Sequence, residues 1–184
     1  MMNIMKKTLT VLAMVVATAF SANAQETKTT TEKGGTKGTF LSIGAEAGVP
    51  TGTLANTHKL GFGGSAKVGF NVIENGYITL NAGYISFASK SAGPSLGSMN
   101  IIPIKAGFRY NFGGFYVEPQ LGWTKAKLKG SDNSESSFTW APNVGIIIAD
   151  VVDLSARYES FNTDGYKGSH VGFRLAYNFN LGGR

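Results

Sequence analysis

The chain has 184 residues, of which 42% are hydrophobic and 25 are glycine, and it contains no cysteine. The lack of cysteine excludes a disulfide framework, a zinc–thiolate site and a lipidated N-terminal cysteine. The formal net charge of +6 is spread along the chain, so it does not predict nucleic-acid binding.

The first 24 residues have the pattern of a secretory signal peptide. Lys6 and Lys7 precede the apolar run Leu9–Phe20, and Ala22-Asn23-Ala24 is a small-residue cleavage motif. Cleavage there would leave 15 basic against 11 acidic residues. Residues 25–37 are polar and threonine-rich, which predicts a flexible leader. We therefore expect the folded domain to begin at residue 38.

Residues 38–179 show repeated alternation of apolar and small polar residues, which is the period of a β-strand. The last repeat, Ser169–Phe179, places Val171, Phe173 and Leu175 on one face, with Gly172 and Arg174 among the residues on the other. Eight such strands are predicted, at residues 41–48, 60–72, 78–84, 102–112, 115–124, 138–148, 154–159 and 169–179. Residues 180–184 would form a short C-terminal tail.

The predicted connections alternate in length. Longer polar loops are expected at Pro50–Lys59, Ala88–Ser98, Leu128–Ser137 and Phe161–Gly168, and tight turns at Glu74–Gly76, Gly113–Gly114 and Asp150–Asp153. Asn75-Gly76 is a strong hairpin signal. An even number of strands with short turns on one side and longer loops on the other is typical of outer-membrane barrels. The predicted fold is an all-β, eight-stranded, antiparallel, up-and-down transmembrane β-barrel.

The two faces of the strands predict two environments. Eight strands enclose an interior that side chains can fill. We expect the charged residues of the polar face to pair there: Glu46, Lys67, Lys105, Arg109, Glu118, Arg157, Glu159 and Arg174. Aromatic residues near strand ends are expected to form the girdle at the lipid headgroups: Tyr77, Phe112, Phe115, Trp123, Phe138, Trp140 and Phe179.

Alternation alone does not say which face points inward. A soluble, lipocalin-like barrel would bury the apolar face and use it as a ligand cavity. The polar face here is rich in glycine, serine, threonine and asparagine rather than in the lysine and glutamate of a solvent face, which favours the membrane barrel.

The signal peptide, the blocks KVGFNV, KAGFRYNF and VGFRLAYNF, and the aromatic last strand make the chain resemble the small OmpA/OmpX-like outer-membrane β-barrel proteins of Gram-negative bacteria. The resemblance implies an outer-membrane location and contact with membrane lipid and lipopolysaccharide. It also implies that the barrel-assembly machinery reads the last strand, with Phe179 as its terminal aromatic residue. The residues after Phe179 depart from the family pattern.

Three functions are compatible with this fold. The first is a structural or surface-interaction role through four outward loops and a filled polar interior. The second is a narrow passive, porin-like channel. The third is a lipid-modifying enzyme.

The enzyme alternative depends on His58 and His170, the two histidines of the chain. Ser169, Asp164 and Glu159 lie close to His170 in sequence, but Ser169 and His170 are neighbours on a strand and point to opposite faces. A weak cation site at Asp132 and Glu135 lacks the ligand count of a calcium loop. We therefore expect no catalytic, metal or cofactor site.

Overall fold

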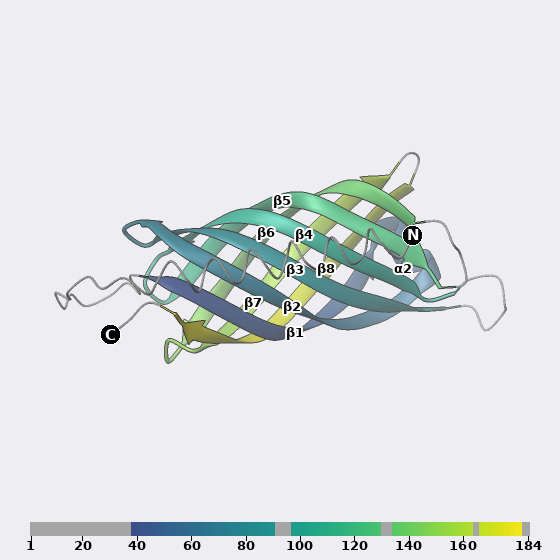
Figure 1. Cartoon of the computed structure of the whole chain (residues 1–184). Helices are drawn as coiled ribbons and strands as arrows, with labels where there is room; N and C mark the ends of the chain where they lie inside the picture. Colours follow the sequence, from purple (N-terminus) through teal and green to yellow (C-terminus); the bar gives the residue numbers. More distant parts are fainter. Residues whose placement is uncertain (1–37, 91–96, 130–133, 164–165, 182–184) are drawn as a thin grey trace.

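The computed structural model describes residues 38–90, 97–129, 134–163 and 166–181. They form a closed barrel in which each strand pairs antiparallel with its neighbour in sequence, and β1 pairs with β8 (Figure 1). The elements are β1 (Thr39–Thr51), α2 (Gly52–Thr57), β2 (His58–Ile73), β3 (Gly76–Ser89), β4 (Met99–Asn111), β5 (Phe115–Leu128), β6 (Ser134–Ile148), β7 (Val152–Thr163) and β8 (Tyr166–Asn180). The predicted eight-stranded up-and-down barrel is confirmed.

The two ends of the barrel differ. At one end lie the three short β2–β3, β4–β5 and β6–β7 connections together with the start of β1 and the end of β8; we call it the turn end. Asn75, Ala149 and Asp150 adopt positive φ in these turns. At the other end lie α2 and the β3–β4, β5–β6 and β7–β8 connections; we call it the loop end (Figure 1).

The apolar face of the strands points outward. Phe62 is 65% exposed, Trp123 is 66% exposed and Leu121 is 57% exposed, whereas the polar and charged residues of the opposite face are buried. A barrel in water would show the reverse. The lipocalin-like alternative is therefore wrong, since the apolar face lines no internal cavity. In the described part of the chain, no helix is long and apolar enough to cross a membrane.

The strands extend further than the sequence pattern predicted. The expected loop at Phe161–Gly168 is wrong, because β7 continues to Thr163 and β8 begins at Tyr166, and Phe161 pairs with Gly168. The pattern misled here because Phe161 is an apolar residue on the inward face, which breaks the alternation. The predicted signal peptide and the leader lie outside the described residues, and so does most of the tail.

Candidate functional site

The interior of the barrel holds a network of nine charged side chains from six strands. They are the eight expected residues, Glu46, Lys67, Lys105, Arg109, Glu118, Arg157, Glu159 and Arg174, together with Asp153. Each of the nine is buried. Asp153 was predicted to lie in a turn, which is wrong because β7 already begins at Val152. Asp153 precedes Ser155 by two residues and Arg157 by four, and this even spacing is the signal that places it on the inward face.

Glu118 on β5 lies at the turn-end side of this network. Its Oε2 is 2.7 Å from Lys67 Nζ and 3.3 Å from Arg109 Nε. Its Oε1 accepts hydrogen bonds from Thr79 Oγ1 at 2.7 Å and from Gln120 Nε2 at 2.8 Å. Asn143 Nδ2 also donates to Oε2 at 3.2 Å. Two cations and three neutral donors therefore compensate the burial of one carboxylate, which would otherwise be strongly unfavourable.

Asp153 connects Glu118 to the seam between the first and last strands. Arg109 Nη2 donates to Asp153 Oδ2 at 2.9 Å, and Tyr116 OH donates to Asp153 Oδ1 at 2.7 Å. Arg174 Nη1 lies 3.6 Å from Asp153 Oδ2, and Arg174 Nε lies 3.6 Å from Glu46 Oε1. Because Glu46 is on β1 and Arg174 is its partner on β8, this ion pair spans the strands that close the barrel.

The network continues toward the loop end through Arg157. Its Nη1 donates to Glu46 Oε2 at 2.6 Å, and its Nε donates to Glu159 Oε2 at 2.9 Å. Glu159 also pairs with Lys105. Five cations and four carboxylates thus form one continuous chain of contacts, and the inclusion of Asp153 reduces the interior excess of positive charge to one.

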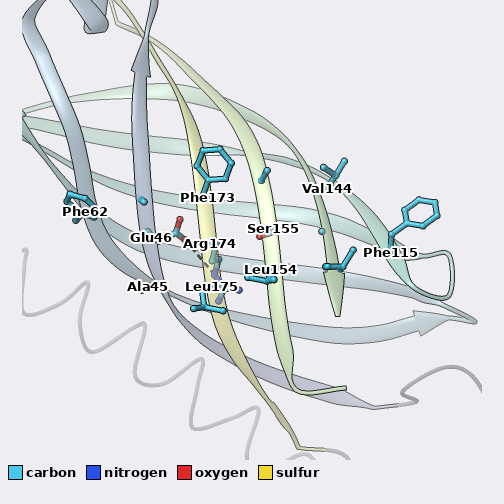
Figure 2. A pocket seen from close by; sticks show the side chains of 14 residues that line it. Ala45, Glu46, Phe62, Phe115, Val144, Leu154, Ser155, Phe173, Arg174 and Leu175 are labelled. Atoms are coloured by element: carbon cyan, nitrogen blue, oxygen red, sulfur yellow. Dashed lines mark ion pairs between the residues drawn. The ribbon is translucent and has the colours of Figure 1, made fainter. Parts of the chain in front are cut away.

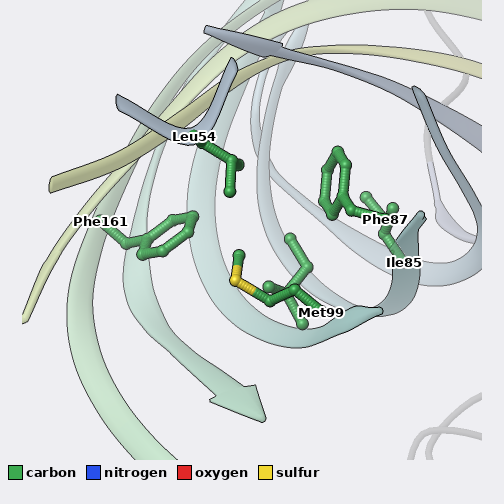
Figure 3. Close-up of a cluster of buried hydrophobic side chains, with 6 residues drawn as sticks. Leu54, Ile85, Phe87, Met99 and Phe161 are labelled. Carbon is green, nitrogen blue, oxygen red and sulfur yellow. The ribbon is translucent and has the colours of Figure 1, made fainter. Parts of the chain in front are cut away.

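Toward the loop end, the polar interior gives way to six buried apolar residues, which we call the loop-end cluster. Its members come from α2, β3, β4 and β7 and point toward one another (Figure 3): Leu54, Ile85, Phe87, Met99, Ile101 and Phe161. Leu54 is the one contributed by the short helix α2 and is fully buried. The cluster fills the interior on the loop-end side of the charged network.

At the turn end, aromatic rings pack around Arg109. The guanidinium carbon lies 3.9 Å from the ring centroid of Tyr116 and 4.9 Å from that of Phe40. Phe40 in turn packs edge-on against Tyr77 at 5.6 Å. Tyr77 is only 2% exposed, so its expected place in the aromatic girdle is wrong. It shares the inward face of β3 with Thr79, as its spacing of two already indicated.

The other six residues expected in the girdle lie on the outer wall and are exposed: Phe112, Phe115, Trp123, Phe138, Trp140 and Phe179. Phe112 stacks on Phe115 at 5.1 Å toward the turn end, and Trp123 packs edge-on against Phe138 at 6.3 Å toward the loop end. Their role at the lipid headgroups stays a prediction.

Ser169 and His170 do not form a nucleophile–base pair in the described structure. His170 is fully buried beside Phe87, and neither ring nitrogen has a hydrogen-bond partner. Ser169 Oγ instead contacts Thr51 Oγ1 at 2.9 Å. A serine nucleophile needs its base within hydrogen-bond reach, and this pair lacks that contact. His58 Nδ1 contacts Thr57 Oγ1. Glu135 is exposed, whereas Asp132 and Asp164 lie outside the described residues.

A groove of about 790 Å³ lies on the barrel wall across β1, β8, β7 and β6 (Figure 2). Its lining includes small apolar residues such as Ala45, Ala47 and Ala156 and larger ones such as Phe173 and Leu175. These apolar side chains belong to the outward face, so the groove faces away from the charged network. Glu46, Ser155 and Arg174 also border the groove, but their side chains are buried in the interior, so the surface that the groove exposes is almost entirely apolar.

Comparisons with known proteins agree with this architecture. Ail, the attachment invasion locus protein of Yersinia pestis, superposes with a TM-score of 0.55 at 17% identity, covering 78% of this chain and 99% of that one. A second structure of Ail, in complex with the heparin analogue sucrose octasulfate, gives 0.54 at 14% identity, covering 77% and 97%. The N-terminal β-barrel domain of Pseudomonas aeruginosa OprF gives 0.52 at 14% identity, covering 80% and 100%.

No curated protein matches the chain by sequence. The family of the outer membrane protein beta-barrel domain, in contrast, matches residues 10–179, which is most of the chain. The resemblance to small outer-membrane barrels is therefore confirmed, and this protein belongs to the outer membrane protein beta-barrel domain family.

Proposed function

We propose that this protein is a non-conducting outer-membrane scaffold that interacts with its surroundings through its loop end. The observation that carries the proposal is the filled interior, in which the charged network is followed by the loop-end cluster. The family match and the similar solved barrels support an outer-membrane location.

The packing of the interior argues against the narrow channel. Lys67, Arg109 and Glu118 are at most 1% exposed, so no water-filled path runs alongside them. An ion crossing the barrel would have to break several buried ion pairs, each of which is expensive to separate. It would also have to displace the apolar side chains of the loop-end cluster.

We further propose that the turn end faces the periplasm and the loop end faces outward. The chain enters β1 and leaves β8 at the turn end, and a signal peptide at residues 1–24 would deliver it from that side. The assembly machinery would then read β8, and the loop end would cross the membrane first. The enzyme alternative receives no support from the described contacts of His58 and His170.

Planar-bilayer recording of the purified, refolded barrel tests the proposal directly. We expect no steady open conductance. A wide porin added to the same bilayer must conduct, and the inserted barrel must migrate as a folded band on a gel, so that silence does not reflect failed insertion. A steady conductance would support the porin-like channel instead.

A sulfated polysaccharide is the first ligand class to test at the loop end, since Ail was solved with a heparin analogue. Exposed Lys90 and Lys129 lie at this end, whereas exposed Glu74 and Asp150 lie at the turn end. We expect the folded barrel to be retained on immobilised heparin and released by salt. If the folded barrel passes through the heparin column at low salt, sulfated polysaccharides are excluded as ligands. The proposal of a non-conducting scaffold would not be affected by that result.

A further inference from the structure

The outer wall of β5 changes from apolar to cationic at its loop end. Phe115, Leu121 and Trp123 lie on this face and are exposed. The next two residues on the same face are Lys125 and Lys127, which are also exposed. We propose that Lys125 and Lys127 bind the anionic phosphate of a lipid headgroup in the surrounding membrane leaflet.

The height of the two lysines on the barrel fits the headgroup layer. From Phe115 to Lys125 the strand rises about 34 Å at about 3.4 Å per residue. With the strand tilt of about 40° that is usual in such barrels, this is about 26 Å along the barrel axis. The apolar band of outer-membrane barrels is about 25 Å tall. Lys125 therefore lies at the edge of the hydrocarbon, directly beyond the Trp123–Phe138 pair.

The charges of these lysines are not compensated by the described protein. Within the part of the chain that the structure describes, the ammonium group of neither lysine forms an ion pair or a hydrogen bond. Two residues on one face of a strand are about 7 Å apart, which is within the screening length of about 8 Å at physiological salt. The two ammonium groups therefore repel each other, and an anion between them would relieve this repulsion.

The neighbouring strands supply polar groups but no carboxylate on this wall. Lys125 pairs in register with Ser136 of β6, and Lys127 pairs with Ser134 of β6 and Asn100 of β4. Ser136 is exposed, and Ser134 and Asn100 are half-buried. Hydroxyl and amide groups beside two ammonium groups are good partners for phosphate oxygens. Glu135 pairs with Ala126 and so belongs to the inward register.

The arrangement is one-sided. Among the described residues, the turn end carries exposed Glu74 and Asp150 but no exposed lysine or arginine. An anionic lipid in the other leaflet would therefore find no equivalent pair on the barrel wall. The lysine pair distinguishes the two leaflets by charge, whereas the aromatic residues occur toward both ends.

Fluorescence quenching of Trp123 tests the proposal, because this ring lies next to Lys125 on the outer wall. Trp140→Phe leaves Trp123 as the sole tryptophan of the chain. The barrel is inserted into vesicles of phosphatidylcholine in which phosphatidylglycerol alone carries bromine on its acyl chains. We expect Trp123 fluorescence to be quenched more strongly than a random distribution of phosphatidylglycerol around the barrel would produce. One lysine near the surface is worth about fivefold in lipid preference.

Lys125→Gln with Lys127→Gln should bring quenching down to the bulk fraction. Lys59→Gln is the matched control, because it removes an exposed lysine at the same end of the barrel on β2, far from β5. It should leave the preference unchanged. Each variant must keep the heat-dependent gel shift of a folded barrel. Quenching of the parent at the bulk fraction, or equal losses in the control and the double variant, would overturn the proposal.

Discussion

At the scale of single residues, the inward charges explain how a membrane protein can bury nine ionised groups. Glu118 illustrates the principle, since five side chains donate to its two oxygens or pair with them at 2.7–3.3 Å. Such a group is stable only as part of the set. Its removal leaves the buried ammonium group of Lys67 without its counter-charge and leaves Arg109 with Asp153 as its one remaining carboxylate partner.

Glu118→Gln should therefore destabilise the barrel by about 3–5 kcal/mol, the usual cost of breaking a buried pair. The measurement is the temperature at which the folded band disappears on an SDS gel. Glu74→Gln is the control, because Glu74 is an exposed turn residue and loses only a solvated charge. Equal midpoints for the two variants would show that the interior pairs do not hold the barrel together.

At the scale of elements, close approach between β2 and β3 shapes the loop-end cluster. A Cβ added at Gly61 would lie 2.6 Å from the ring of Phe87, which is fully buried. The glycine is therefore required by space and not by backbone conformation. The ring fills the place that a side chain at residue 61 would occupy, and it also packs edge-on against His170 at 5.4 Å.

Gly61→Ala should lower stability by about 1–3 kcal/mol, because the ring of Phe87 must move in a packed cluster. Gly114→Ala is the matched control, since an added Cβ there meets nothing within 4 Å. The same gel assay measures both. If Gly61→Ala unfolds no earlier than Gly114→Ala, the cluster is looser than its contacts indicate.

The short helix α2 depends on contacts with the rest of the barrel. A helix of this length is not stable by itself, so the burial of Leu54 and the bond from Lys90 Nζ to the Ala55 carbonyl must hold it. Leu54→Ala should speed hydrogen exchange of the α2 amides while the strands stay protected. Asn56→Ala changes an exposed residue of the same helix and should not. If the α2 amides of Leu54→Ala stay as protected from hydrogen exchange as those of the parent, contacts other than Leu54 hold the helix.

Alternation in the sequence predicted the strand count and the eight charged residues that share one face. The glycine, serine, threonine and asparagine of that face then predicted that it points inward and that the apolar face points outward. The sequence-based prediction was wrong where the polarity of a residue did not match the face or the part of the strand on which it lies. Phe161 and Phe87 are apolar but inward, so the alternation breaks off before the true ends of β7 and β3. Asp153 is charged and close to a turn, and Tyr77 is aromatic and close to a turn, so both were misplaced. The choice of partner within the charged network depends on the register between neighbouring strands. The alternation within a single strand does not reveal that register.

At the scale of the whole molecule, closure leaves no unpaired strand edge among the described strands, because β1 pairs with β8 from Phe40–Asn180 to Thr51–Ser169. Denaturing detergent must therefore break a continuous ring of backbone hydrogen bonds. Outer-membrane fractions run on a gel without boiling should show a band of shifted mobility that boiling abolishes. A protein found in the soluble periplasmic fraction with no shift would contradict the membrane barrel.

The pairing of β1 with β8 also sets the order of events during biogenesis. The residues that meet at this seam are among the most distant in the domain, and contacts of that kind form slowly because a long segment must be ordered first. Until β8 arrives, the outer edge of β1 remains open to pairing with any other extended chain. We therefore expect the unfolded protein to need a chaperone on its way to the membrane. The risk of aggregation is expected to last until β8 pairs with β1 and closes the barrel.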